Sequence, residues 1–68
     1  MSSKVHFVSG EPIEVRDSTT AFDTLTEGSI RHSTATDADG NEYEAGGRTQ
    51  EAADGNAIFG LFKNRGDD

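Results

Sequence analysis

The feature that most limits how this chain can fold is that it has few large apolar side chains and no covalent cross-link. The 68 residues include no cysteine, so neither a disulfide nor a thiolate metal site can hold the fold together. A chain this short buries a small fraction of its surface, and small domains usually need support beyond their core. Self-association or a partner is the support that remains. The large apolar residues are Val5, Phe7, Val8, Ile13, Val15, Phe22, Leu25, Ile30, Tyr43, Ile58, Phe59, Leu61 and Phe62.

The charge of the chain is strongly negative, −7 from 13 acidic and 6 basic residues. Such a field repels nucleic-acid phosphates and anionic membrane surfaces, so we expect direct contact with neither and favour protein partners, basic ones in particular. Lysine occurs only at Lys4 and Lys63. Many carboxylates with few lysines are typical of proteins that work in high salt, where self-repulsion is screened. An ordinary acidic domain is the alternative.

Alternating apolar residues and turn signals predict two β-hairpins. In residues 4–8, Val5 and Phe7 face one way while His6 and Val8 face the other. Residues 9–12 contain glycine and proline and predict a turn, so the first hairpin spans about residues 4–16. Residues 29–36 are rich in β-formers, 37–41 form a turn, and 42–44 return as the second hairpin, which the pair of glycines at 46–47 ends.

Three other segments are harder to assign. Asp17 and Ser18 can cap a helix over about 18–27, ended by Gly28, but the threonines within it favour a strand. The polar stretch 48–56 predicts a loop or one short helical turn. Residues 57–63 can complete a small sheet as a strand. As a helix, they would place Ile58, Leu61 and Phe62 on one side with Phe59 beside them.

Together these elements predict one small, mainly β domain over residues 1–68, with a short acidic tail over 64–68. The expected architecture is a β-meander or partial barrel built from two hairpins, with one or two short helices. An α+β arrangement is the alternative, which depends on the helix-or-strand choice at 18–27 and 57–63.

Catalytic and metal-binding motifs find little support in the residues. The 37–41 stretch resembles the start of an EF-hand calcium loop, but glycine and glutamate miss their required positions in either register. A plain hairpin turn with, at most, a weak cation contact at Asp37 or Asp39 is the better interpretation. His6 and His32 have no second ligand at metal-binding spacing. With no phosphate-binding loop and no cysteine nucleophile, we expect a protein without catalysis, cofactor or metal.

The segment richest in large apolar side chains lies near the C-terminus. It supplies the candidate interface residues Ile58, Phe59, Leu61 and Phe62. These side chains either fill the domain's own core or partly dock on another subunit, since buried aromatic residues are typical interface anchors. The first functional hypothesis is a non-catalytic structural protein, a minor subunit of a larger assembly such as a virus particle, in a decoration or connector role. The alternative is an acidic inhibitor whose carboxylates mimic nucleic-acid phosphates and block a basic cleft.

Localisation follows from the ends and hydropathy of the chain. The N-terminal residues lack the apolar run of a signal peptide, and no stretch approaches the ~20 apolar residues of a membrane-spanning helix. We therefore expect a cytoplasmic or virion protein that is not secreted by a signal peptide.

Overall fold

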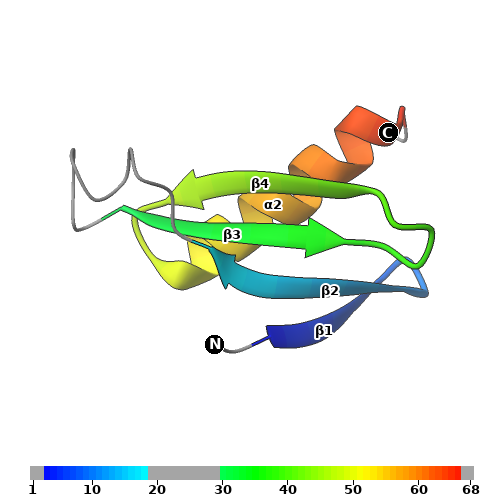
Figure 1. The fold of residues 1–68 in the computed structure, drawn as a ribbon, viewed down its shortest axis with the longest axis horizontal. Coiled ribbons are helices and arrows are strands. Elements are labelled where there is room, and N and C mark those ends of the chain that lie inside the picture. Colours follow the sequence, from blue (N-terminus) through cyan, green and yellow to red (C-terminus); the bar gives the residue numbers. More distant parts are fainter. Residues whose placement is uncertain (1–2, 19–29, 67–68) are drawn as a thin grey trace.

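Four antiparallel strands followed by one helix make up the part of the chain that the structure describes, residues 3–18 and 30–66 of a computed structural model (Figure 1). The strands are β1 (Ser3–Val8), β2 (Glu11–Ser18), β3 (Arg31–Thr36) and β4 (Glu42–Gly47), and they lie side by side in the order β1-β2-β3-β4. The helix is α2 (Gln50–Arg65). The predicted mainly β meander is confirmed, and the sheet does not close into a barrel.

The first hairpin is confirmed, but its turn is shorter than predicted. Ser9 and Gly10 alone form the turn, with φ values of 53° and 79°, as a type I′ turn requires at both central residues. Glu11 and Pro12, expected in the turn, begin β2. Pro12 lies opposite Phe7, one pair beyond the hydrogen-bonded Val8–Glu11 pair that closes a two-residue turn. At that position no N–H is needed for the ladder to β1, which is why proline is tolerated.

The second strand also extends further than the predicted hairpin. Asp17 and Ser18 pair with Ser33 and His32 in β3, so they continue β2. The rest of the helix or strand considered for 18–27 lies outside the described residues. The second hairpin and its 37–41 turn are confirmed, although β4 runs on through the glycines at 46 and 47.

The long helix corrects the sequence prediction for residues 48–56. α2 has 16 residues and begins at Gln50, in the stretch predicted as a loop. Thr49 is its N-cap, and its hydroxyl accepts the N–H of Ala52 at 3.0 Å. The helix includes Asn64 and Arg65 and ends at Gly66, whose φ of 91° is the left-handed conformation of a C-terminal cap. Asn64 and Arg65, expected in the acidic tail over 64–68, are therefore helical, and residues 67–68 lie outside the described part of the chain.

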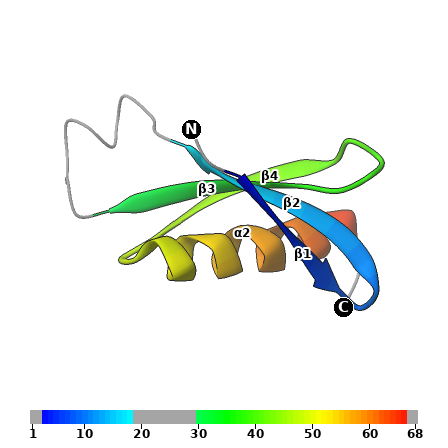
Figure 2. The ribbon, with the colours of Figure 1, turned by 90° about the horizontal axis from the view of Figure 1, so that it is seen from below.

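The core lies between α2 and one face of the sheet (Figure 2). Within residues 3–18 and 30–66 no helix lies on the opposite face, which carries Val5, Phe7, Glu14, Thr36 and Glu42 and is called the uncovered face below. Ile13, Val15, Ala35, Ala57 and Leu61 form the buried cluster. Alanines let the helix approach the strands closely, and this explains how a chain with few large apolar residues closes a core. α2 is too short and too polar to cross a membrane.

Candidate functional site

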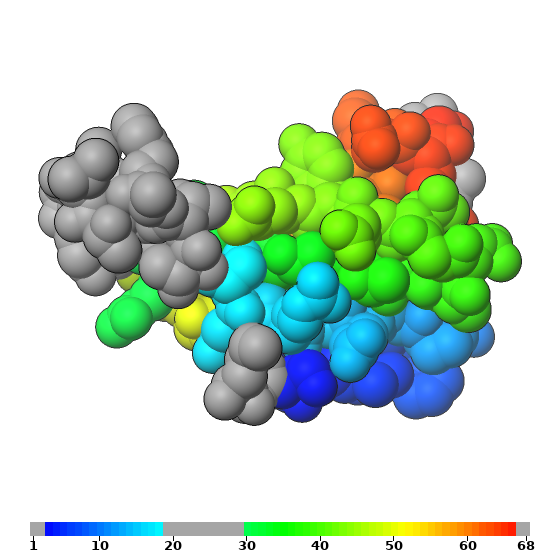
Figure 3. Space-filling view, viewed as in Figure 1, coloured from blue at the N-terminus to red at the C-terminus, as the bar shows by residue number. Residues whose placement is uncertain are grey.

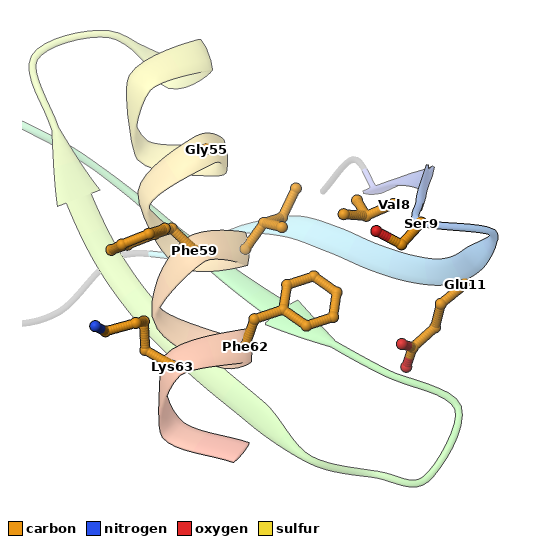
Figure 4. Close-up of a pocket in the computed structure, with 8 residues that line it drawn as sticks. Val8, Ser9, Glu11, Gly55, Phe59, Phe62 and Lys63 are labelled. Atoms are coloured by element: carbon orange, nitrogen blue, oxygen red, sulfur yellow. The ribbon is translucent and has the colours of Figure 1, made fainter. Parts of the chain in front are cut away.

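One helix is too narrow to cover the whole of the sheet face on which it packs, and a groove remains beside the helix on that face. Four strands about 4.8 Å apart are wider than a helix of about 10 Å diameter. α2 packs mainly on β4 and β3 and less on β2, so the inner side of the β1–β2 turn stays open. The resulting groove has a volume of about 700 Å³. It is lined by Val8, Ser9 and Glu11 from the hairpin and by Gly55, Ile58, Phe59, Phe62 and Lys63 from the helix (Figure 4).

The four candidate interface residues divide between the core and this groove. Leu61 is fully buried in the core. Ile58 and Phe62 are half-buried, packing against the core with one side and lining the groove with the other. Phe59 is 66% exposed, and Figure 4 shows its ring directed away from that of Phe62. The cluster thus fills the core with Leu61 and leaves three apolar side chains at the surface.

A second hollow borders Phe59 on the other flank of the helix. It measures about 530 Å³ and is lined by Tyr43, Ala45, Asn56, Phe59, Gly60, Lys63 and Asn64. Gly60 makes room for the Tyr43 ring, because a Cβ at position 60 would lie 2.2 Å from that ring. Phe59 is therefore an apolar ridge between two hollows. Sequence reasoning missed Val8 of β1 and Tyr43 of β4 as lining residues, since only the packing of α2 brings these two strands beside Phe59.

Arg65 anchors the end of the helix to both hairpins and so fixes the wall of the groove. Its Nη1 donates to Glu11 Oε2 at 2.7 Å and to Asp37 Oδ2 at 2.8 Å, and its Nη2 donates to Glu11 Oε1 at 3.2 Å. The guanidinium also lies 4.8 Å from the centre of the Phe62 ring, a cation–π contact. Phe62 is consequently held in place from both sides, by the core and by Arg65.

The Asp37 turn is closed by its own hydrogen bonds. Oδ1 of Asp37 accepts the N–H groups of Asp39 and Asn41, each at 2.9 Å, while Oδ2 accepts from Asn41 Nδ2 at 3.0 Å and from Arg65. The hydrogen bond from the Asn41 side chain, more than offsetting burial and helped by the backbone N–H groups and Arg65, holds the Asp37 pKa below its usual value. Both carboxylate oxygens are engaged, so the weak cation contact considered at Asp37 finds no open ligand.

The two histidines considered as metal ligands lie on opposite faces of the sheet. His6 pairs with Ile13 of β2, whose side chain is in the core, whereas His32 precedes the buried Ser33 and points to the other face. His32 Nδ1 lies 3.8 Å from Glu44 Oε2. Among residues 3–18 and 30–66, no three His, Asp or Glu side chains are placed to hold a metal ion.

A buried polar cluster joins the first half of the helix to β1 and β3. The Ser33 hydroxyl donates to Asp54, Gln50 Nε2 donates to Ser33 Oγ at 2.6 Å, and Lys4 Nζ lies 3.3 Å from Asp54 Oδ2. Burial acts to raise the Asp54 pKa, but hydrogen bonds from Ser33, Gln50 and Lys4 outweigh it and hold the pKa below its usual value. The His32 side chain lies on the opposite face of the sheet, so its imidazole cannot act as a base on the Ser33 hydroxyl. The cluster instead anchors the first half of α2 to β1 and β3.

The geometry thus defines a class: a small antiparallel meander with one covering helix and an apolar groove beside it. Comparison with protein-family models, with curated proteins and with solved structures finds no match to this chain.

Proposed function

We propose that this protein is a non-catalytic interaction protein, a minor subunit of a larger assembly such as a virus particle, in a decoration or connector role. The observation that carries the proposal is Phe59, a large aromatic side chain that is 66% exposed on a regular helix and flanked by an apolar hollow on each side. Within the fold the ring has a cation–π contact with Lys63, whose Nζ lies 5.8 Å from the ring centre, and its exposed surface gains further by burial against a partner.

The shape of the groove supports docking of a peptide segment over binding of a small solute. The half-buried, apolar Ile58 and Phe62 line it together with the charged Glu11 and Lys63. A mixture of apolar and charged groups is usual at a protein interface. The Arg65 anchor holds the helix wall and the hairpin wall together, so the groove is formed before a partner arrives and docking loses less conformational entropy.

A photo-crosslinking amino acid at position 59 tests the proposal in cells of the natural source. The matched control carries the same group at position 51, an exposed residue on the same helix that lines neither hollow. We expect a discrete adduct from position 59, identified by mass spectrometry, and little from position 51. Equal adducts from both positions would count against the groove.

Reconstitution with the identified partner completes the test. We expect Phe59→Ser to weaken binding of the purified partner by about 30-fold, as truncation of a central aromatic anchor does. Glu51→Gln should bind like the wild type. If Phe59→Ser binds as well as the wild type, the ridge is not the docking element and the proposal fails.

The same reconstitution separates docking from the acidic inhibitor. The inhibitor hypothesis draws on the charge of −7 and on exposed Glu14 and Glu42, which lie on either side of Thr36 on the uncovered face. A phosphate mimic would lose its partner steeply as salt rises, because screening removes the attraction. Binding that survives about 1 M salt supports apolar docking, and steep loss with unchanged binding by Phe59→Ser supports the inhibitor.

A further inference from the structure

We infer that the outer edge of β1 pairs with β1 of a second copy of this chain, which extends the sheet across a two-fold axis. This surface is the side of β1 that faces away from β2. In Figure 3, β1 forms the lower margin of the uncovered face.

The register shows which backbone groups point outward from β1. The two-residue turn makes Val8–Glu11 a hydrogen-bonded pair, and such pairs alternate along an antiparallel ladder. His6 and Lys4 are therefore bonded to β2, while Ser3, Val5 and Phe7 direct their N–H and C=O groups to the outer edge. A row of unpaired backbone groups is a template for another strand.

The same residues carry exposed apolar side chains on the uncovered face. Val5 is 58% exposed and Phe7 is 73% exposed, and the exposed Pro12 lies opposite Phe7. Edge strands usually avoid association through charged side chains, lysine above all. In β1 the one lysine, Lys4, is on the helix side of the sheet, where its Nζ lies 3.3 Å from the buried Asp54 Oδ2 and its side chain is 57% exposed. On the uncovered face β1 carries Ser3, Val5 and Phe7, none of which is charged.

Charge selects a second copy at this edge and disfavours it elsewhere. The chain carries −7 overall, so two copies repel each other over most of their surface. The segment Ser3–Val8 contains no acidic residue and one lysine. Of the two edge strands, it is the one along which a second acidic chain meets less repulsion, since β4 carries Glu42 and Glu44.

A register centred on Val5 pairs every outward residue with its counterpart. Val5 then opposes Val5 of the second copy, and Phe7 opposes Ser3, with the second copy's Val5 as its diagonal neighbour. Opposed side chains of antiparallel strands share a face, so both helices lie on the same side of an eight-stranded sheet and both Phe59 ridges stay open. The contact is a small one, in the size class of weak, transient interfaces.

Sedimentation velocity over a wide concentration range tests the inference. We expect a mass near 7.3 kDa in dilute solution that rises towards twice this value as the concentration is increased, as a weak interface implies. Val5→Lys should remain a monomer with an unchanged fold, because the Val5 side chain is mostly exposed. Phe59→Lys, which removes an equally exposed apolar residue from the helix, should dimerise normally. Dimerisation lost in Phe59→Lys and kept in Val5→Lys would overturn the inference.

Disulfide formation tests the register independently, since the chain has no cysteine of its own. Opposed hydrogen-bonded residues have Cα atoms about 5.5 Å apart, within the span of a disulfide. Val5→Cys should therefore form a covalent dimer under mild oxidation. Phe7→Cys should not, because the two copies of residue 7 would lie about 13 Å apart, four residues along the strand. A monomer at every concentration, or faster crosslinking by Phe7→Cys, contradicts the inference even if the docking groove is real.

Discussion

At the scale of single residues, two carboxylates of this acidic chain hold α2 to the sheet near its two ends. Asp54 and Asp37 are both buried, and each is surrounded by hydrogen-bond donors. Asp54 joins the first half of α2 to β1 and β3, whereas Asp37 receives Arg65 at the last turn. The helix is thus held at both ends by a buried acid, and the apolar groove lies between these two anchors.

We expect Asp54→Asn to lower the free energy of unfolding by about 1–3 kcal/mol at neutral pH, the cost of breaking a buried polar network. The amide keeps the shape of the carboxylate but brings its own N–H groups to Ser33 and Gln50, and it no longer attracts Lys4. Urea unfolding checks this value. Glu51→Gln, an exposed change on the same helix, should leave stability unaltered, and an equal loss there would argue against the network.

The lowered pKa values predict an acid limit to stability. A carboxyl whose folded pKa lies below its unfolded value, near 3.8, stabilises the fold above that value and loses this effect as pH falls through the folded pKa. We expect unfolding free energy to fall below about pH 4. The fall should be shallower in Asp54→Asn, measured by urea unfolding at several pH values. An identical slope in the variant would show that Asp54 does not titrate with folding.

At the scale of elements, the glycines define how closely the helix sits on the sheet. A Cβ on Gly47, the last residue of β4, would lie 2.7 Å from the backbone N of Ala53 and 2.9 Å from the backbone carbonyl carbon of Ala52. Backbone atoms of a helix cannot move aside as a side chain can. The first turn of α2 therefore depends on the absence of a side chain at Gly47.

Two glycine substitutions should act in opposite directions. We expect Gly47→Ala to destabilise the fold by about 1–3 kcal/mol through overpacking. Gly55→Ala should stabilise it by about 0.5–1 kcal/mol, because Gly55 lies within α2, a Cβ there meets nothing within 4 Å, and alanine is the better helix former. Thermal melts of the two single variants check the pair. If Gly47→Ala melts at the same temperature as the wild type, α2 packs less closely on β4 than the structure shows.

At the scale of the whole molecule, a charge of −7 on a chain of 68 residues opposes folding as well as association. On the uncovered face, Glu14 and Glu42 lie on either side of Thr36 in the strand register. Salt screens such repulsion and leaves the apolar core intact. The acidic composition therefore couples stability to ionic strength.

We expect the melting temperature to rise as salt is increased from about 0.1 M to about 1 M, where the Debye length shortens from about 10 Å to 3 Å. The double variant Glu14→Gln/Glu42→Gln should melt higher than the wild type at low salt and show a smaller rise. Thermal melts followed by circular dichroism test both statements. A melting temperature independent of salt would contradict the contribution of self-repulsion and weaken the high-salt interpretation of the composition.

Local signals in the sequence determined the two hairpins. Alternation of Val5 with His6 and of Ile13 with Glu14, together with turn residues at 9–10 and 37–41, acts between neighbours and needs no distant contact. The helix was harder to predict because its first half is polar. Thr49 as a cap and the alanines at 52, 53 and 57 carry the signal, but Asp54 and Gly55 within the same turn favour a loop.

Tertiary structure alone decided how the apolar residues are used. The periodicity of residues 57–63 allows the apolar side chains there either to fill the core or to lie at a surface; these are Ile58, Phe59, Leu61 and Phe62. Only the packing of α2 against β3 and β4 buries Leu61 and leaves Phe59 exposed. Likewise, alternation separates Val5 and Phe7 from His6 and Val8 without saying which side meets the helix. That choice depends on which face of the whole sheet buries more apolar surface, and Ile13, Val15 and Ala35 all lie on the helix side.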